Sequence, residues 1–412
     1  MKVLIVAALW PEPTSSAAGR RMMDLLKQFH AQGWSITYAC TAMASEHCYP
    51  LESLNIKRQS IAVNDATFDV FISNLSPDIV LYDRFMVEEQ FSWRVEKHCP
   101  TAMSMLETSD LHCLRSAREI AVKKAREFNQ ADLMNDVAYR EIASILRTDL
   151  TLIISSYEMT LLSSVFKVDE SLIHYHPFMV DTKDAQNKAN NWPSYEERNG
   201  FICIGNFKHA PNWDSVQYLK QEIWTRIRQQ LSAAELFIYG AYPPPKAFQL
   251  NKEKDGFYIK GRADNVETVM QRARVCLAPL RFGAGLKGKL LDAMESGTPS
   301  VTSSVGAEAM HGDLPWNGFV EDEPQAFADL AVKLYTNKSM WQTCQSQGMD
   351  ILQQCYSSTR FMQPLIERII SVKDQLADHR LQNFQGAMLK HHLMKSTKYM
   401  SLWIEEKNKR KE

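Results

Sequence analysis

The sequence predicts an α/β protein with two Rossmann-like domains. Short apolar runs alternate with segments of helical periodicity along most of the chain, as in parallel sheets covered by helices on both faces. The 412 residues exceed what one hydrophobic core usually serves. A polar, proline-bearing stretch without periodicity lies at residues 181–200. We therefore expect one domain at residues 1–185 and a second at residues 200–357.

Composition and charge limit the classes of function. The net charge is −1, so the chain as a whole has no field that attracts nucleic acid. Its eight cysteines form no C-x-x-C pair, which predicts reduced core residues and no metal site. No run approaches the roughly 20 apolar residues of a membrane-spanning helix, and the first apolar run ends at Pro11 without a cleavage segment. A cytoplasmic protein is expected.

The first domain is expected to begin with a strand, a loop of small residues and a helix. Residues 3–9 are apolar and predict a buried first strand. Residues 11–19 are turn and capping residues, and residues 20–28 place apolar side chains on one side of a helix. Further strands are predicted at residues 35–40, 56–62, 79–82, 101–106 and 150–155.

Polar residues follow the predicted strand at residues 101–106. Ligands of parallel sheets bind beyond the carboxyl ends of the strands, so we expect Asp110 and His112 in the cleft. The alternative is that Asp110 caps the following helix and that His112 is merely exposed on its first turn. The charged segment at residues 111–147 is predicted to be helical, either as a surface for an anionic acceptor or as a solvated face.

The second domain repeats the alternation of strands and helices. Its strands are predicted at residues 201–204, 235–239, 257–260, 275–280 and 300–303. Helices are predicted at residues 324–335, 339–354 and 358–374. The loop after the strand at 257–260 contains Arg262 and Asp264, and Asp264 is suited to cap the helix at residues 266–272.

The most informative stretch, residues 275–308, combines a strand, a glycine-rich loop with two lysines, and a helix. Gly283 and Gly285 leave room for a ligand near the backbone, and Lys287 and Lys289 bring positive charge. A loop that enters a helix N-terminus offers unpaired N–H groups to an anion, and diphosphate fits this pattern. Residues 283–289 also match the phosphate loop of nucleoside triphosphatases. The next residue is a leucine, however, where that loop requires the hydroxyl of Ser or Thr.

Four ordered motifs resemble glycosyltransferases of family 4, the group 1 glycosyltransferases, which have the GT-B fold. The resemblance implies two Rossmann-like domains that face each other across a cleft. Residues 205–212 (GNFKHAPN) are similar to the GN-x-x-x-x-PN turn of one branch of these enzymes. Residues 278–289 (APLRFGAGLKGK) resemble the APLR-x-GAG-x-KGK segment of that branch. Residues 291–299 (LDAMESGTP) and 306–308 (GAE) resemble its following helix and loop.

The resemblance implies transfer of a sugar from a nucleoside diphosphate to a hydroxyl of a glycan or glycolipid, in polysaccharide or glycolipid biosynthesis. It implies no metal or other cofactor and retention of anomeric configuration. The diphosphate would contact Gly19, Arg20, Arg281, Gly285, Lys287 and Lys289. Asp292 would bind the ribose, Arg262 and Asp264 would lie beside the base, and His112 with Asp110 would be catalytic. The C-terminal helices from about residue 358 to 412 would complete the first domain.

The sequence also departs from the family pattern. Ala284 stands where many members have the first of two glutamates, and Asn206 stands where they have an arginine. Gly19 and Arg20 could also form a plain turn with a solvated arginine. Two rival functions therefore remain open: a nucleotide-sugar 2-epimerase on the same fold, and a non-catalytic relative that binds a glycan or a partner.

The C-terminal segment at residues 389–412 is both basic and apolar. Its lysines outnumber its glutamates, and it contains Leu393, Met394, Tyr399 and Trp403. Such a helix can lie on an anionic membrane surface or can be a docked terminal helix with a charged end. Peripheral membrane contact is one of the two expectations.

Overall fold

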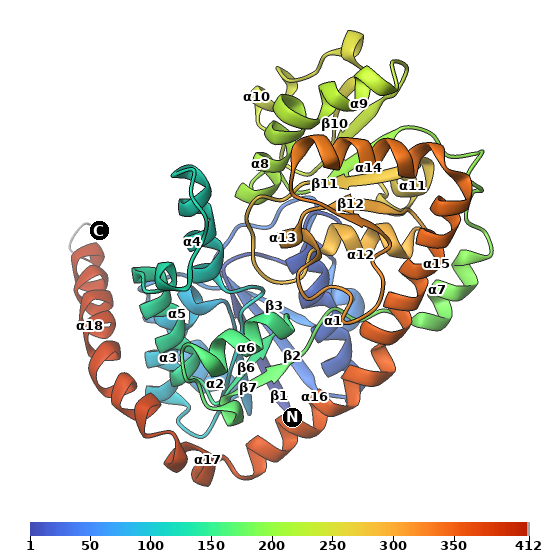
Figure 1. Ribbon diagram of the computed structural model, residues 1–412. Helices are drawn as coiled ribbons and strands as arrows, with labels where there is room; N and C mark the ends of the chain where they lie inside the picture. The colour runs from blue at the N-terminus through green and yellow to red at the C-terminus, as the bar shows by residue number, and fades with distance from the viewer. Residues whose placement is uncertain (410–412) are drawn as a thin grey trace.

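The computed structural model describes residues 1–409, without the side chains of residues 393 and 394, and contains two parallel sheets (Figure 1). The first sheet has the strand order β3-β2-β1-β4-β5-β6-β7. Its strands are β1 (Lys2–Ala7), β2 (Ser35–Cys40), β3 (Lys57–Ser60), β4 (Ile79–Asp83), β5 (Met103–Glu107), β6 (Leu150–Ile153) and β7 (Ile173–Tyr175). The second sheet has the order β10-β9-β8-β11-β12-β13. Its strands are β8 (Phe201–Ile204), β9 (Leu236–Tyr239), β10 (Phe257–Gly261), β11 (Val275–Ala278), β12 (Ser300–Thr302) and β13 (Gly318–Val320).

Two edge strands were not predicted from the sequence. β7 and β13 are each three residues long and each pairs with one neighbouring strand. A run of three residues is too short to show a period of two. The sheet and not the local sequence therefore determines these strands.

Helices cover both faces of the first sheet because successive side chains of β1 point to opposite sides. Val3 and Ile5 pack with α1 (Ala17–Ala31) and with α16 (Ser358–Asp374), which arrives from the far end of the chain (Figure 1). Leu4 and Val6 face the other layer. That layer includes α2 (Thr67–Leu75), α3 (Phe85–His98), α4 (His112–Lys123), α5 (Asp136–Arg147) and α6 (Ser156–Ser164).

The helix predicted at residues 111–147 is interrupted. α4 ends at Lys123, and Ala125 has a φ of 48°, which a helix does not tolerate. Asn129 and Asn135 each accept a hydrogen bond from a backbone N–H further along the chain and so begin a short 3-10 turn and α5. The prediction of one continuous helical segment was wrong because these asparagines act as N-caps.

The second sheet is also covered on both faces. One layer contains α8 (Ala210–Tyr218), α9 (Trp224–Gln230), α10 (Pro245–Phe248), α14 (Pro324–Thr336) and α15 (Lys338–Cys355). The other contains α11 (Val266–Arg272), α12 (Gly288–Glu295) and α13 (Ser304–Ala307). The stretch predicted to be irregular between the domains forms α7 (Thr182–Ala189), because Asp181 caps it and Ala185 is buried against the second sheet's core.

The chain ends with α17 (Leu376–Gln382) and α18 (Phe384–Lys409), which lies beside α3 and α5 (Figure 1). Buried Arg94 of α3 holds α18 through Nη2, which donates to Glu405 Oε2 at 3.1 Å and to Ser401 Oγ at 3.3 Å. The side chains of Leu393 and Met394, and residues 410–412, belong to the predicted membrane contact but lie outside the described part of the chain. Within that part, no helix is long and apolar enough to span a bilayer.

Candidate active site

A cavity of about 880 Å³ lies between the carboxyl ends of the two sheets. The first sheet contributes residues that follow β1, β4 and β5, among them Trp10, Arg84 and Asp110. The second sheet contributes residues that follow β8 and β10, among them Gly205 and Arg262. Loops at the carboxyl ends of parallel strands are where such sheets bind ligands, so this cavity is the candidate site.

Two helix N-termini meet at the cavity. α1 and α12 approach so closely that a Cβ added to Gly288 would lie 2.6 Å from Ala17 Cβ. The backbone N–H groups of Ala17, Ala18, Gly288 and Lys289 donate to no acceptor among residues 1–409. Four free N–H groups at the positive ends of two helices favour an anion between them.

Both predicted lysines line this anion site, and both bind neutral oxygens. Lys287 Nζ donates to the carbonyl oxygen of Gly285 at 2.5 Å. Lys289 Nζ donates to Asn212 Oδ1 at 2.6 Å. Burial lowers the pKa of Lys287 to about 8, with the charge of Glu308 partly opposing it. Burial also lowers the pKa of Lys289. Neither ammonium group is neutralised by a direct ion pair within the described chain.

Arg20 crosses the cavity to the acids of α12. Its Nη1 lies 2.9 Å from Asp292 Oδ1 and 2.7 Å from Glu295 Oε2, and its Nη2 lies 2.9 Å from Glu295 Oε1. Burial raises the pKa of Asp292 to about 6, and Arg20 opposes that rise. The structure therefore brings Arg20 and Asp292 into direct contact. Glu295 was missed, although its i, i+3 spacing from Asp292 places both on one face of the helix.

Arg262 also reaches across the cavity. Its Nη1 donates to Ser15 Oγ at 2.8 Å and its Nη2 donates to Thr14 Oγ1 at 2.7 Å. Asp264 lies exposed at the cavity edge but does not cap α11, because Asn265 Oδ1 accepts the capping bond from Thr268 N–H. The capping prediction for Asp264 was therefore wrong.

Arg281 lies away from the diphosphate position predicted for it. Arg281 is exposed and does not line the cavity. Its Nε donates to Asp214 Oδ2 at 2.8 Å, and its guanidinium lies 4.9 Å from the centre of the Tyr218 ring. The carboxylate of α8 thus draws this side chain to the outer surface.

The predicted glycines serve packing more than ligand binding. Gly285, with a φ of 62°, donates its N–H to Glu158 Oε1, and a Cβ added there would lie 2.8 Å from Asp110 Cβ. Gly19 lines the cavity but donates its N–H to Ser16 Oγ at 3.0 Å. Gly285 is therefore a contact between the domains, and the Gly19 N–H is not free for a phosphate.

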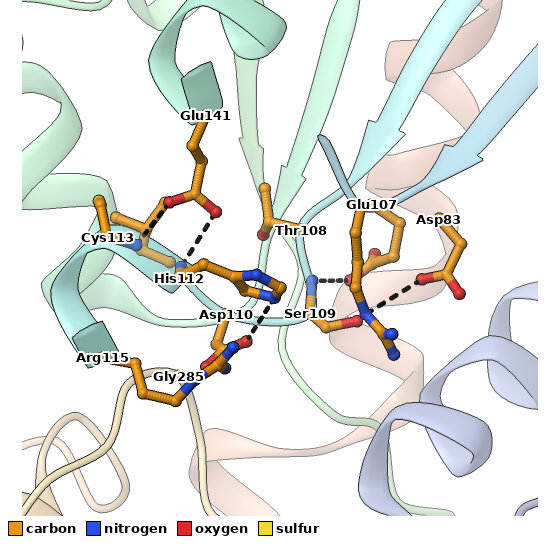
Figure 2. Close-up of polar contacts among 12 residues, drawn as sticks. Asp83, Glu107, Thr108, Ser109, Asp110, His112, Cys113, Arg115, Glu141 and Gly285 are labelled. Atoms are coloured by element: carbon orange, nitrogen blue, oxygen red, sulfur yellow. Dashed lines mark hydrogen bonds and ion pairs between the residues drawn. The ribbon is translucent and has the colours of Figure 1, made fainter. Parts of the chain in front are cut away.

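Asp110 and His112 lie together on the wall of the cavity that the first domain forms (Figure 2). Asp110 lies between His112, whose Nε2 is 3.5 Å from Asp110 Oδ1, and Arg115, with which it forms an ion pair. Asp110 does not cap α4. Instead, Glu158 accepts from Leu111 N–H, and Glu141 accepts from the N–H groups of His112 and Cys113.

The pKa values show which group of this pair is charged at neutral pH. Burial lowers the pKa of His112 to about 4, although Asp110 opposes the shift. Burial disfavours ionisation of Asp110, but Arg115, His112 and His209 together outweigh it and lower that pKa to about 2. At neutral pH the site therefore holds a neutral imidazole beside a carboxylate. This imidazole can both donate and accept a hydrogen bond.

Asp83 and Arg84 were not predicted, although they directly follow a predicted strand. Arg84 has φ 75° and ψ 156°, a region that is essentially restricted to glycine and costs about 1–3 kcal/mol. The next residue, Phe85, packs its ring edge against His112, with 5.5 Å between the ring centres. The carboxyl-end rule that indicated Asp110 applies equally to Asp83. Applied to the strand predicted at residues 79–82, that rule would have indicated Asp83 as a site residue.

Buried polar contacts fix the glycine-rich loop to the first domain. Arg118 of α4 donates to Gly283 O at 2.9 Å and holds Glu308 through two hydrogen bonds of 2.9 and 2.6 Å. Neither Arg118 nor Glu308 was predicted as a site residue. Within the described residues, no group of three or more His, Cys, Asp and Glu side chains is arranged to hold a metal ion.

Comparisons with known proteins agree with this architecture. Residues 198–337 match the family model described as Glycosyl transferases group 1. Among curated proteins, no match to the sequence is found. The family match confirms the resemblance and the assignment as a glycosyltransferase that the motifs predicted.

Solved structures extend the likeness to the whole fold. Sucrose-phosphate synthase from Thermosynechococcus elongatus is 15% identical, with 90% of this chain and 99% of that chain covered and a TM-score of 0.64. A point mutant of TarM from S. aureus, in complex with fondaparinux, α-GlcNAc-glycerol and UDP, is 9% identical, with coverages of 90% and 100% and a TM-score of 0.67. HepE from Anabaena, with UDP and glucose, is 12% identical, with coverages of 90% and 100% and a TM-score of 0.65. These likenesses confirm the GT-B fold.

Proposed function

Because the chain is a glycosyltransferase of the GT-B fold with a group 1 domain, we propose that it moves a sugar from a nucleoside diphosphate to a hydroxyl acceptor. The main support is the anion site where α1 and α12 meet, with Lys287 and Lys289 beside it. The similar TarM and HepE structures contain UDP, which fits a uridine nucleotide as the donor.

The proposed mechanism depends on charge that develops during the reaction. When the bond between the sugar and the diphosphate breaks, negative charge grows on the leaving phosphate. The free N–H groups of both helices and the ammonium groups of Lys287 and Lys289 stabilise that charge where it forms. These cations supply the positive charge, so we propose transfer without a metal ion.

Asp292 is proposed to bind the ribose of the donor. In the structure its carboxylate holds Arg20, at 2.9 Å from Nη1. A bound nucleotide would take Arg20 to the diphosphate and leave Asp292 to accept the ribose hydroxyls. Charge-assisted hydrogen bonds of this kind contribute about 1.5–3 kcal/mol each.

His112 and Asp110 are proposed to act at the reacting sugar. The neutral His112 ring can hydrogen-bond a sugar or acceptor hydroxyl, while Asp110 and Phe85 fix its orientation. Ala284 lines the cavity where many family members have a glutamate. Its methyl group cannot make the contact to the sugar that a carboxylate would make from that position. Retention of anomeric configuration is proposed from the family likeness alone.

A nucleotide panel tests the donor site. Calorimetric titration with UDP, GDP, ADP and dTDP should show binding of at least one of them. Lys289→Met should weaken that binding about 10- to 100-fold, because it removes a charge-assisted contact of about 1.5–3 kcal/mol. Lys338→Met is the matched control, since Lys338 is exposed and pairs with Glu196 outside the cavity.

Two results would contradict the proposal. If no nucleoside diphosphate binds the wild-type protein, a non-catalytic relative becomes the better description. If NMR of the products shows an altered sugar nucleotide without any acceptor, the protein is an epimerase.

A glycan or glycolipid acceptor of envelope biosynthesis would place the protein at a membrane surface, and α18 is the proposed contact. Its inner face is held by Arg94. Its outer face exposes Met388, Lys395, Tyr399 and Trp403, and Lys407 Nζ lies 5.1 Å from the centre of the Trp403 ring. Aromatic rings with neighbouring lysines are typical of helices that bind anionic lipid surfaces.

Co-sedimentation with lipid vesicles tests this surface. We expect the protein to bind vesicles of phosphatidylcholine and phosphatidylglycerol more strongly than vesicles of phosphatidylcholine alone. Changing Tyr399 and Trp403 to serine should lower binding at least fivefold, because both side chains are exposed. Phe248→Ser is the control, since Phe248 is 49% exposed on α10 of the second domain. Equal binding by both variants would remove the proposed contact.

A further inference from the structure

We propose that the part of the cavity beyond β1, β2 and β4 binds the acceptor as a neutral glycoside with an apolar aglycone. Asp83 would accept hydrogen bonds from the glycoside hydroxyls, and Leu9 and Met43 would contact the aglycone. This inference rests on the proposed function and specifies its acceptor. It is carried by three features of this wall: a carboxylate that accepts no hydrogen bond, acids that lie beside bases, and an apolar rim.

Asp83 is a buried carboxylate without a hydrogen-bond donor. Its side chain is 9% exposed, and its one ion-pair contact is with Arg84 Nε at 3.6 Å. No hydrogen bond to this carboxylate exists among residues 1–409. Neighbouring Tyr38 is not available, because its hydroxyl donates to Leu9 O at 2.9 Å. Buried carboxylates normally accept several hydrogen bonds, so donors from a ligand would complete this site.

The position of Asp83 suits a group that must reach the reacting centre. It ends β4, next to β5, whose following loop carries Asp110 (Figure 2). Phe85, two residues after Asp83, contacts the His112 ring. The strained Arg84 backbone between them sets the direction of both side chains. A glycoside bound to Asp83 would therefore lie beside His112.

Two acids of this wall lie beside basic side chains. Asp83 pairs with Arg84, and Asp110 pairs with Arg115. His112 is neutral at physiological pH because burial lowers its pKa to about 4. Glu12 at the rim accepts hydrogen bonds from the hydroxyls of Ser45 and Tyr242, so this wall has no excess of positive charge for an anionic ligand, and it offers many donors and acceptors to a neutral polyhydroxyl compound.

The rim of this part of the cavity is apolar and exposed. Met43 is 93% exposed and Leu9 is 56% exposed, and both line the cavity next to buried Trp10. A free sugar has no apolar surface that would cover these side chains. An alkyl or lipid aglycone does, and its burial would be favourable.

Titrations with synthetic glycosides test the subsite. Octyl and methyl β-glycosides of glucose, galactose and N-acetylglucosamine are titrated, below the micelle concentration, into protein saturated with the nucleoside diphosphate that binds it. We expect one octyl glycoside to bind at least tenfold more tightly than its methyl counterpart. Asp83→Asn should weaken that binding at least tenfold, because an amide accepts fewer hydrogen bonds than a carboxylate. Glu46→Gln is the control, since Glu46 is exposed on a neighbouring loop and does not line the cavity.

A second pair of variants isolates the rim. Changing Leu9 and Met43 to serine should reduce the octyl-to-methyl preference to about one, whereas Met134→Ser, at a 55% exposed position outside the cavity, should preserve it. Nucleoside diphosphate binding, measured on the same variants, should stay within twofold of wild type. If nucleotides bind but no glycoside does, or if Asp83→Asn binds glycosides as well as wild type, the subsite is wrong. If no nucleotide binds the wild-type protein, the proposed function itself fails.

Discussion

The two walls of the cleft present their charges in opposite ways. On the second domain, Lys287 and Lys289 bind only neutral oxygens, and free helix N–H groups lie beside them. On the first domain, Arg84 offsets the charge of Asp83, and Arg115 offsets the charge of Asp110. An anion gains charge-assisted contacts at the first of these walls, whereas a neutral ligand suits the other. This difference separates the proposed donor and acceptor sites of one cavity.

Arg20 is the exception to this division, because it begins on the first domain but is bound by acids of the second. Its guanidinium lines the same cavity as the free N–H groups of both helices. The donor site is therefore complete only when the two domains are together. A diphosphate that binds Arg20 would link both walls.

The largest effect that would sharpen this comparison is a dependence of donor affinity on pH. Burial lowers the pKa of Lys287 to about 8. In the free protein this ammonium group is protonated below that pH and neutral above it, and a bound diphosphate favours the protonated form. The dissociation constant of the nucleoside diphosphate should therefore rise by up to about tenfold per pH unit above pH 8. Calorimetry at about pH 7.5, 8.5 and 9.5 measures this rise.

Lys287→Arg supplies the control for the pH series. An arginine stays protonated throughout this range, so the variant's affinity should change little with pH. A wild-type dissociation constant that is flat to about pH 9.5 would mean that Lys287 does not contact the diphosphate.

A smaller effect is expected when the competitor for Arg20 is removed. Glu295 binds both terminal nitrogens of Arg20, so a nucleotide must displace it. Glu295→Gln should tighten nucleoside diphosphate binding about threefold, because the amide holds the guanidinium less strongly. Glu222→Gln on the same domain is the control, since Glu222 pairs with Arg226 outside the cavity. Weaker binding by Glu295→Gln would show that Glu295 instead orients Arg20 for the donor.

The last effect is on stability rather than on affinity and concerns the strained backbone on the first-domain wall. Arg84→Gly and Arg84→Ala both remove the side chain, but only glycine relieves the conformation at φ 75°. Arg84→Gly should be more stable than Arg84→Ala by about 1 kcal/mol, or roughly 2–4 °C in Tm. Thermal unfolding measures the order. At Lys27, which is exposed in the middle of α1, the same two substitutions should show the reverse order.

The predictions from sequence succeeded where a local pattern was long enough to be informative. β2 and β8 span the residues predicted for them, and α11 and α16 do so as well. The short edge strands β7 and β13 were missed because three residues show no periodicity. The asparagine caps before α5 broke a helix that charge patterning suggested was continuous.

Among the residues of the candidate site, too, some predictions succeeded and others failed. Lys287, Lys289 and Asp292 were predicted because they lie within six consecutive residues, at the end of one motif and the start of the next, and the structure brings all three to the cavity. Arg281 belongs to the same motif, yet the carboxylate of Asp214 draws it to the surface. Sequence spacing gave no indication of that distant partner.

The sequence by itself determined the alternation of strands and helices and the cationic glycine loop, because each depends on neighbours within one strand or one helix turn, and its ordered motifs indicated the GT-B fold. Only the tertiary structure decided which charges are neutralised. Arg20 meets Glu295, and Arg118 meets Glu308, across separations of 275 and 190 residues. Electrostatic energy depends on distance in space, so a site built between two domains acquires its charge pattern only when both have folded and met.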